Sequence, residues 1–446
     1  MCSSDLKTAT PADIVPKLDS LVPGDVLELA DGTYNVSTLI LNRSGSATQR
    51  IYIRGKTRAG VVLRNARRVM QLENASHIVI ENLTIEGSGV DSGTSASSAG
   101  IEFWNGAVQD DVTLRDLDMR GVDTGIIASG PTRSVLIYNN MMRGNNTWDA
   151  ASLHSNATWN DDGIRIPGQG NAVFENTLHG FGDSFAINAG DFSAAVYFYR
   201  NRVTMTGDDA FEGDYGTRNL GFYDNYITNS GTLLSLDPLW GGPLYCFRNI
   251  SINTYRGPFK LNSSDSGFMI YNNTIVRTEG RTEWGWVQYN NGSLNNWSYR
   301  NNILLYRGTN GNLLAVESSG AQLMDFAFNA WSFDGSVLWT NTGGTFGSLA
   351  QARANLPAIT PLFDTATKRH QNDVISVSDP FVTPITLGAD HLTQITASTI
   401  PSLRAGVSAK NAGTPIANIN DGFSGAAPDM GAIIEGRPAV RYGALR

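Results

Sequence analysis

The fold is decided by the stretch YRNRVTMTGDDAFEGDYGTRNLGFYDNYITNSGTLLSL, residues 199–236. It contains the pattern aromatic-x-Asn twice, and each copy is followed by alternating apolar residues. The complete series of such asparagines is Asn140, Asn176, Asn201, Asn225, Asn249, Asn273 and Asn301, with Asn82 and Asp116 as irregular earlier members. From Asn176 to Asn273 the successive steps are 25, 24, 24 and 24 residues. A nearly fixed period of this length indicates a repeat protein.

Each repeat contains two or three short apolar runs bounded by Gly, Asn or Asp. Strands this short cannot bury an apolar face alone, whereas stacked copies can. An asparagine at the same place in every coil can hydrogen-bond to the asparagines of the coils before and after it. We therefore predict an all-β fold, a single-stranded right-handed parallel β-helix with coils about 4.8 Å apart. The signature of leucine-rich repeats is missing, and a propeller would need a longer period.

The two ends of the chain predict capping segments. Pro11–Leu21, PADIVPKLDSL, is a short amphipathic segment, and SLAQARANLP, residues 348–357, predicts a second short helix. We expect a β-helix domain over residues 11–345 and a C-terminal capping region over residues 346–446 that packs on it. The opening letters MCSSDL resemble a translated adaptor, so we expect residues 1–10 to be a non-native, disordered start and the native N-terminus to be missing.

Composition and charge exclude several classes of function. The formal net charge of −8 argues against a nucleic-acid partner. No run approaches the roughly 18 apolar residues that indicate a membrane span. With only Cys2 and Cys246 in the chain, a disulfide framework and a cysteine zinc site are excluded. Cys246 lies in an alternating apolar run, which predicts an inert core thiol. We expect the protein to be a monomer.

The inward apolar pairs of successive coils set the coils in register, and alternation then turns the residue between each pair outward. The outward column is Glu102, Ile127, Arg165, Ala186, Glu212, Ser235 and Lys260. A second column, two positions before the first apolar residue of each pair, is Thr124, Asp162, Asp183, Asp209 and Thr232. Strict alternation would turn the side chains of the second column inward. We therefore place this column in the turn that enters each strand, where the alternation does not hold.

The acidic residues gather most densely in TGDDAFEGD, residues 206–214. Carboxylates at strand spacing repel each other by about 1 kcal/mol in water, and more when they are partly desolvated. Their pKa values rise unless a cation compensates them. A purely structural ladder would favour neutral asparagine, which this chain uses elsewhere. The pattern therefore predicts either a bound metal ion or protons shared within a catalytic group of carboxylates.

The acidic pattern resembles that of the calcium-dependent pectate lyases of the ninth polysaccharide-lyase family. Those enzymes carry an aspartate on one coil and Asp-Asp-x-x-Asp on the next; here Asp183 is followed by Asp208, Asp209 and Glu212 at the same offsets. Their catalytic base is a lysine in a Gly-Phe-Lys-Leu segment, and this chain has GPFKLN with Lys260. The resemblance covers about eighty central residues. It departs from the family in two residues. Glu212 stands where the family has the last aspartate of Asp-Asp-x-x-Asp, and a serine stands where glycine is usual.

The resemblance implies Ca²⁺-assisted β-elimination in an acidic polysaccharide, with Asp183, Asp208, Asp209 and Glu212 as the metal ligands. Lys260 would remove the proton on C5 of the uronate. Since the ordinary lysine pKa is about 10.4, it must be lowered, and Ca²⁺ and Arg165 would do this by like-charge repulsion. The side chains that we expect to bind the sugar are Trp240, Tyr215, Arg218 and Arg256. Such an enzyme would be secreted or periplasmic.

Two other readings remain open. NDDG at residues 160–163 and the following GDS faintly resemble the polygalacturonase class, so the chain could be an inverting glycoside hydrolase that uses Asp162, Asp183 and Asp209. The Gly-His-Gly and Arg-x-Lys signatures of that class are missing. A non-catalytic glycan-binding β-helix is the third reading. His154, in the long insertion before the acidic column, is a further candidate for substrate contact.

Overall fold

The structure is a computed structural model. It describes residues 5–89, 98–104, 106–149, 153, 161–187, 193–261, 266–277, 287–289, 296–307, 312–316, 324–332, 336–339, 344–356, 358–359, 367–376 and 379–445. The chain divides into two compact units: Met1–Asp208 with Tyr442–Arg446, and Asp209–Arg441. The division falls inside a single strand, β23 (Arg202–Glu212). The domain boundaries at residues 11, 345 and 346 remain a prediction.

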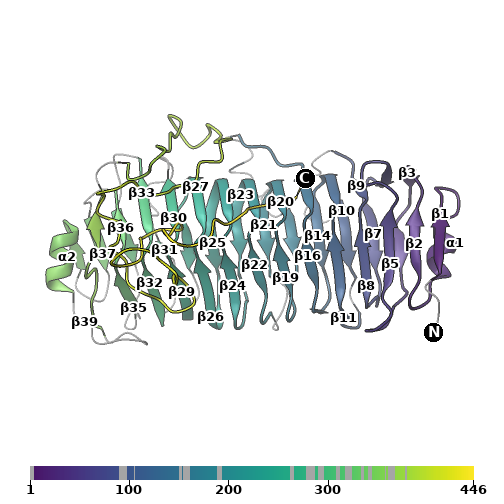
Figure 1. Ribbon diagram of the computed structural model, residues 1–446, viewed down its shortest axis with the longest axis horizontal. Helices are drawn as coiled ribbons and strands as arrows, with labels where there is room; N and C mark the ends of the chain where they lie inside the picture. Colours follow the sequence, from purple (N-terminus) through teal and green to yellow (C-terminus); the bar gives the residue numbers. More distant parts are fainter. Residues whose placement is uncertain are drawn as a thin grey trace. The chain divides into compact units, whose positions relative to one another are not determined.

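The first unit consists of three stacks of parallel strands (Figure 1). Its first stack is β1 (Leu6–Ala9), β2 (Val26–Leu29), β5 (Ile51–Gly55), β8 (Ile78–Glu81), β12 (Val112–Arg115), β16 (Leu136–Tyr138), β19 (Ala172–Phe174) and β22 (Tyr197–Tyr199). Its second stack is β3 (Gly32–Asn35), β6 (Val61–Arg64), β9 (Thr84–Glu86), β13 (Asp118–Val122), β17 (Met141–Gly144), β20 (Thr177–Phe181) and the start of β23. Its third stack is β4 (Leu39–Leu41), β7 (Arg68–Leu72), β10 (Ala99–Phe103), β14 (Thr124–Ala128), β18 (Asp162–Arg165) and β21 (Asp183–Ala186). β11 (Gln109–Asp110) and β15 (Thr132–Arg133) form a separate short pair.

The second unit is built in the same way. One stack is β24 (Leu220–Tyr223), β26 (Trp240–Phe247), β29 (Ser266–Tyr271), β32 (Trp297–Arg300) and β35 (Met324–Ala327). A second is the start of β25 (Tyr226–Leu236), β27 (Ile250–Thr254), β30 (Thr274–Arg277), β33 (Ile303–Tyr306), β36 (Ala330–Trp331) and β41 (Val374–Ile375). The third is the end of β25, β28 (Phe259–Leu261) and β31 (Val287–Tyr289). Smaller pairings join β34 (Asn312–Val316), β37 (Ser336–Trp339) and β38 (Gly344–Phe346), and β39 (Ala358–Ile359) with β40 (Thr367–Lys368).

These parallel stacks form a β-solenoid, which confirms the predicted fold class. The core forms because the predicted inward residues of successive coils lie directly over one another. In the third stack of the first unit, Ile101 pairs with Ile126, Ile126 with Ile164, and Ile164 with Phe185. All four side chains are fully buried. Cys246 is buried as predicted, and burial raises the pKa of its thiol.

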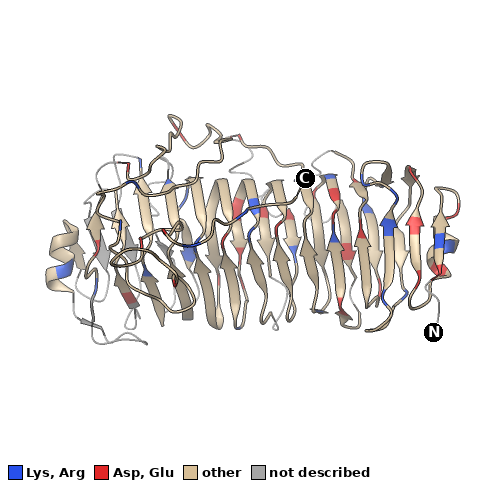
Figure 2. Ribbon diagram, viewed as in Figure 1, with Lys and Arg blue, Asp and Glu red and all other residues tan. Residues whose placement is uncertain are grey.

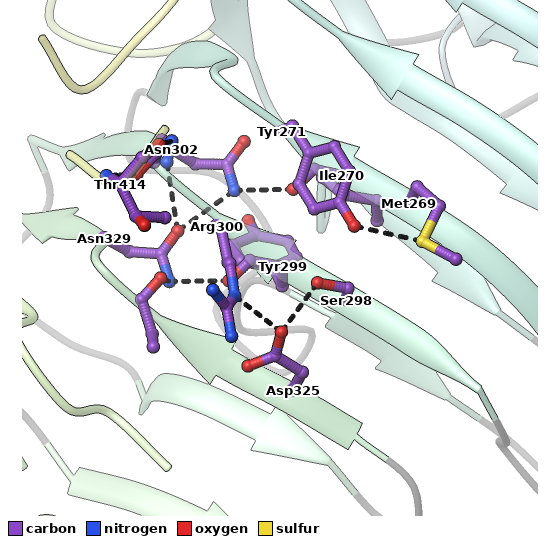
Figure 3. Close-up of polar contacts among 12 residues, drawn as sticks. Met269, Ile270, Tyr271, Ser298, Tyr299, Arg300, Asn302, Asp325, Asn329 and Thr414 are labelled. Atoms are coloured by element: carbon purple, nitrogen blue, oxygen red, sulfur yellow. Dashed lines mark hydrogen bonds and ion pairs between the residues drawn. The ribbon is translucent and has the colours of Figure 1, made fainter. Parts of the chain in front are cut away.

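The predicted asparagine ladder is present in both units. In the first unit, Asn140 Nδ2 donates to Asn176 Oδ1 at 2.9 Å, and Asn176 donates to Asn201 at 3.1 Å. In the second unit, the ladder runs through Asn225, Asn249, Asn273, Asn302 and Asn329, with each Nδ2–Oδ1 distance 3.0 Å. Figure 3 shows its last two asparagines together with the ion pair of Arg300 and Asp325, whose atoms are 2.6 Å apart. The ladder satisfies buried amides that would otherwise be costly.

The predicted place in the ladder is wrong for three residues. Asn301 was expected in the ladder, but Asn302 occupies that place and Asn301 lies one residue earlier, with a left-handed φ of +61°. Asn82 and Asp116 have left-handed φ values of +57° as well, and their strands align them with the turn residue before Asn140. Aspartate and asparagine are among the residues that tolerate this conformation best. The motif therefore marks two neighbouring positions, the turn residue and the ladder residue.

The last asparagine of the ladder, Asn329, donates its backbone N–H to Asp373 Oδ1 at 2.7 Å. The other carboxylate oxygen of Asp373 accepts a bond from Trp331 Nε1 at 2.9 Å and lies 2.8 Å from His370 Nδ1. The ladder of amides thus ends on a carboxylate whose two oxygens are both engaged.

Both predicted end helices are present and short. α1 (Ile14–Asp19) buries Ile14 and Leu18, and α2 (Leu349–Asn355) buries Leu349 and Ala352. The expectation of a disordered start is wrong for β1, which pairs in parallel with β2 because its alternating residues continue the first stack. Residues 1–4 lie outside the described residues. No helix in the described parts of the chain is long and apolar enough to cross a membrane.

Residues 379–441 form a long irregular segment that lies on the coils of the second unit; we call it the C-terminal strap. It hydrogen-bonds to asparagines with left-handed φ. Asn229 Nδ2 donates to Ile395 O at 3.0 Å, and Asn301 Nδ2 donates to Thr414 O at 2.8 Å. The strap also contributes Ile416 and Ile419 to an apolar cluster with Tyr223, Tyr245, Phe247, Met269 and Tyr271. The strap therefore covers an outward aromatic face in this unit.

Charges on the strands of the first unit alternate in sign between coils, with Lys and Arg beside Asp and Glu (Figure 2). Arg54 pairs with Glu28 at 2.9 Å, and Arg133 pairs with Asp110 at 2.7 Å. Exposed pairs of this kind contribute about 0–1 kcal/mol each. Their arrangement agrees with the register that the apolar core sets.

Candidate functional site

The predicted aspartate column is present in the third stack of the first unit. Asp162 and Asp183 are the first residues of β18 and β21, lie in register with each other, and are only 2% exposed. A carboxylate oxygen of one lies within 4.8 Å of a carboxylate oxygen of the other. Gly163 permits this close stacking, since a Cβ there would lie 2.6 Å from Ser184 O. Both aspartates belong to their strands, so the predicted placement of this column in the preceding turn is wrong for them as well.

Arg165 stands in the predicted outward column, in register with Ile127 on one side and Ala186 on the other. Its Nη2 lies 2.5 Å from Asp162 Oδ2. We expected its charge to act on Lys260, but its contact in the first unit is this ion pair. The guanidinium thereby compensates one of the buried carboxylates and favours the ionised form of Asp162.

Asp208 ends the first unit and brings a third carboxylate to this column. Its backbone N–H donates to Gly182 O at 2.9 Å, directly beside Asp183. A carboxylate oxygen of Asp208 lies within 4.8 Å of one of Asp183. Asp208 is followed in the same strand by Asp209. Our placement of Asp209 in a turn is therefore wrong, because β23 continues without a break through the acidic stretch and ends at Glu212.

In the second unit, the acidic stretch meets the predicted lysine. Lys260 Nζ lies 3.5 Å from Asp209 Oδ2; the aspartate is 2% exposed, and the lysine side chain is 24% exposed. Lys260 lies in register with Ser235, as the outward column predicts. Glu212 follows Asp209 by three residues on the same strand and is half-buried. The structure thus brings two of the predicted residues from distant parts of the sequence, Asp209 and Lys260, to one place.

Asp214 is a site residue whose role the sequence did not reveal. Its Oδ1 accepts hydrogen bonds from Ser235 Oγ at 3.1 Å and from the backbone N–H of Asp237 at 2.8 Å. Burial raises the pKa of Asp214 well above its ordinary range; Glu212, Asp209 and Asp237 raise it further, whereas Lys260 lowers it. The number of nearby acidic residues was a signal, but spacing alone could not show that this one is buried.

Tyr215 and Trp240 are exposed aromatic side chains next to the acidic stretch of the second unit. Trp240 is 60% exposed and Tyr215 is 48% exposed. The backbone fixes their positions, because Tyr215 N donates to Pro238 O at 2.7 Å and Trp240 N donates to Gly216 O at 2.8 Å. Trp240 is the first residue of β26, where the register with β29 shifts.

The two arginines predicted to bind substrate differ in exposure. Arg218 is exposed, two residues beyond Gly216. Arg256 is only 4% exposed, and its guanidinium lies 5.4 Å from the centre of the Tyr255 ring. Little of Arg256 can therefore reach a sugar, and Arg218 is the better placed of the two. His154 lies outside the described residues.

The comparisons with known proteins agree with this fold. No family model and no curated protein matches the sequence. The structure is similar to the A-module of the mannuronan C-5 epimerase AlgE6 of Azotobacter vinelandii, with TM-score 0.52 and 13% identity over 82% of this chain and 94% of that chain. It is also similar to pectate lyase Pel9A, with TM-score 0.48 and 14% identity over 98% and 97% of the two chains. The catalytic unit of a GH87 alpha-1,3-glucanase from Streptomyces thermodiastaticus has TM-score 0.47 and 12% identity over 78% and 68%.

At identities this low, the similarity shows the fold alone. The chain is a parallel β-helix protein, and membership of the ninth polysaccharide-lyase family remains a prediction. The particular chemistry has to be argued from the carboxylates of the third stack and from the lysine beside Asp209.

Proposed function

We propose that this protein is a carbohydrate-active enzyme that cleaves an acidic, uronate-containing polysaccharide by β-elimination, with Lys260 as the base. The observation that carries the proposal is the 3.5 Å distance between Lys260 Nζ and Asp209 Oδ2. A lysine on a β-helix face can remove a proton next to a carboxylate when its amine is neutral, and a cation held by the nearby acidic residues would favour that neutral form by like-charge repulsion. The solved structures that resemble this one are named as carbohydrate-processing enzymes, which agrees with the proposal.

The acidic residues suit a hard divalent cation. Calcium prefers carboxylate oxygens and takes several of them from neighbouring segments. Asp183 and Asp208 each offer an oxygen within 4.8 Å of the other, and the strand of Asp208 continues into Asp209 and Glu212. Of the four ligands that we expect, Asp183 and Asp208 would hold Ca²⁺ in the first unit. When bound, the ion would supply positive charge that neutralises the uronate carboxylate of the substrate and acidifies the proton on C5.

The protein's own residues would perform the remaining steps. The neutral amine of Lys260 takes the C5 proton, and the electron pair of that C–H bond forms the C4–C5 double bond. The C4–O bond breaks at the same time, and the leaving oxygen takes a proton from water. The carboxylate of Asp209 stabilises the ammonium group that forms on Lys260, because opposite charges at this distance attract strongly in a partly desolvated site. Tyr215, Trp240 and Arg218 would bind neighbouring sugars of the same chain.

The test is the variant Lys260→Ala. We expect it to lose the ultraviolet-absorbing unsaturated product on acidic polysaccharides while it keeps the wild-type fold and Ca²⁺ affinity, because only the base is removed. Activity of the wild type should also disappear with a chelator and return with Ca²⁺. Lys410→Ala is the matched control, since Lys410 forms ion pairs with Asp429 at 3.3 Å and Glu435 at 2.6 Å in the same unit. Normal turnover by the Lys260 variant would remove this residue from the mechanism.

A glycoside hydrolase is the second candidate, and one observation favours a particular form of it. The oxygens of Asp162 and Asp183 approach within 4.8 Å, which is nearer the roughly 5 Å of retaining enzymes than the roughly 6.5–9.5 Å of inverting ones. Arg165 would keep Asp162 ionised as the nucleophile, and Asp183 would act as the acid. New reducing ends without an unsaturated product, lost in Asp162→Ala, would identify this activity.

A glycan-binding protein without turnover is the third candidate. It would bind acidic polysaccharide but release neither unsaturated products nor new reducing ends. All three candidates imply a polysaccharide partner, for which we propose a secreted or periplasmic location.

A further inference from the structure

The wall that carries Asp162 and Asp183 continues toward the start of the chain in the same unit. Arg68 pairs in register with Ala99, Ala99 pairs with Thr124, and the strand of Thr124 pairs with that of Asp162. Arg68 therefore belongs to the column of the two aspartates, three coils before Asp162. Three coils correspond to about 14 Å along the solenoid. A sugar polymer that lies along this column and covers Asp162 would extend over Arg68.

Arg68 has a fixed position beside an exposed tryptophan. Its guanidinium carbon lies 5.0 Å from the ring centre of Trp104, and its Nε lies 2.6 Å from Glu102 Oε2. Glu102 is 3% exposed, and its other oxygen accepts a hydrogen bond from Ser129 Oγ at 2.9 Å. This buried carboxylate holds the arginine against the indole, so little conformational entropy is lost when a ligand binds.

Trp104 is held by its backbone and yet remains accessible. Its N–H donates to Leu72 O at 2.9 Å, and its carbonyl accepts a bond from Gln109 Nε2 at 3.0 Å. The residue is 37% exposed, although a tryptophan directly after a core strand could bury its ring against the neighbouring coils. An indole with a polar edge and an apolar face, partly open to water and attached to a rigid wall, is a suitable platform for a sugar ring.

We infer that Arg68 and Trp104 form a distal glycan subsite that binds one acidic sugar of the polymer, separate from the carboxylates that carry the chemistry. The indole would stack on the apolar face of the ring. The guanidinium would hydrogen-bond to the sugar's carboxylate in the forked geometry that arginine favours. The acidic nature of the ligand rests on the proposed function, whereas the site itself rests on the geometry of the first unit.

The subsite predicts a dependence on chain length. A short oligosaccharide bound over the carboxylates cannot reach three coils away, but a long one can. Loss of one well-placed aromatic contact, about 1.4 kcal/mol, corresponds to a tenfold change in affinity. Trp104→Ala should therefore weaken the binding of long acidic oligosaccharides about tenfold and leave that of the shortest ones unchanged.

The experiment measures binding by calorimetry in the full chain that carries Lys260→Ala, so that no turnover occurs. The probes are short and long oligogalacturonates and oligomannuronates, with long neutral cello-oligosaccharides for comparison. Trp104→Ala should lower affinity for every long chain, and Trp104→Phe should restore most of it. Arg68→Ala should lower affinity only for the long acidic chains. Arg64→Ala is the matched control, because Arg64 forms a comparable pair with Glu86 at 2.5 Å on the second stack.

The subsite is overturned if Trp104→Ala and Arg68→Ala bind long and short chains as the parent does, if both lengths weaken equally, or if no acidic oligosaccharide binds. These outcomes are distinct from failure of the proposed function. If the wild type turns over no acidic polymer but the length-dependent loss is observed, β-elimination is wrong and the subsite stands. If Lys260 proves to be the base but chain length has no effect, the subsite alone is wrong.

Discussion

Asp214 has an unusual charge environment in the second unit. It is 8% exposed, lies among three other carboxylates, and its pKa is raised mainly because burial disfavours the charged form. A neutral Asp214 can still accept its hydrogen bonds from Ser235 and Asp237. The second unit therefore accommodates this crowded stretch most easily when at least one of its carboxyl groups is protonated.

This environment predicts how stability changes with pH. The raised pKa means that the folded protein binds the proton of Asp214 more tightly than the unfolded chain does. Its contribution to stability is therefore complete below about pH 4, the ordinary range of aspartate, and is lost as pH rises through the folded-state pKa. We expect Asp214→Asn to remove this loss, so that the unfolding free energy falls less between acidic and neutral pH than in the wild type.

Urea unfolding at several pH values, with chelator present throughout, checks this prediction. Asp19→Asn, at an exposed position in the first unit, is the control and should leave the pH dependence unchanged. An Asp214→Asn protein with the same pH dependence as the wild type would show that Asp214 is already ionised across this range.

At the scale of the element, the asparagine ladder joins one coil to the next. Asn249 is fully buried; its Nδ2 donates to Asn273 Oδ1 at 3.0 Å and to Phe222 O at 2.8 Å, while its Oδ1 accepts from Asn225 at 3.0 Å. Its removal leaves buried partners on both neighbouring coils without a bond. A buried polar group left without a hydrogen bond costs about 1–3 kcal/mol. Removal of the Asn249 side chain therefore weakens the contacts of its own coil with the coil before it and the coil after it.

We predict that Asn249→Ala lowers the unfolding free energy by about 2–4 kcal/mol, since both a donor and an acceptor are lost inside the core. Denaturant unfolding monitored by circular dichroism measures the change. Asn355→Ala, at the exposed end of α2, is the control and should change it by less than about 0.5 kcal/mol. A ladder variant as stable as this control would mean that water replaces the lost amide.

Much of the register could be predicted from the sequence, because alternation and period are backbone properties that every coil repeats. The outward column with Arg165 and Lys260 is confirmed within its respective units. The exact ladder residue near Asn301 could not be predicted, because Asn301 fits the aromatic-x-Asn motif while the ladder uses the adjacent asparagine, Asn302. The contact of Arg165 with Asp162 and the burial of Asp214 depend on side-chain rotamers and on neighbours distant in sequence, about which spacing contains no information.

At the scale of the whole molecule, the C-terminal strap contacts residues of the second unit that lie far from it in the sequence. Arg248 ion-pairs with Asp224 at 2.7 Å and also donates to Ile419 O on the strap. Ile419 itself packs in the aromatic cluster with Phe247 and Tyr271. The strap thus seals an outward apolar face that would otherwise be exposed to water.

We predict that Ile419→Asp lowers the unfolding free energy by about 2–4 kcal/mol and increases the binding of an apolar dye, because a charge cannot stay in the aromatic cluster. Ile400→Asp is the matched control, since Ile400 lies on the same strap and is 42% exposed. Equal stability of the two variants would show that the strap contributes little to the second unit.

The outermost coil of a stack of parallel strands has hydrogen-bonding groups that no further coil uses. A second molecule could pair with these groups in the way that one coil pairs with the next, and molecules could then add end to end. Asp373 removes that possibility for the asparagine series. Its carboxylate can only accept, and Asn329, Trp331 and His370 already use both oxygens. Since no amide is left to relay the pattern, growth of molecules end to end into fibres is disfavoured at this position.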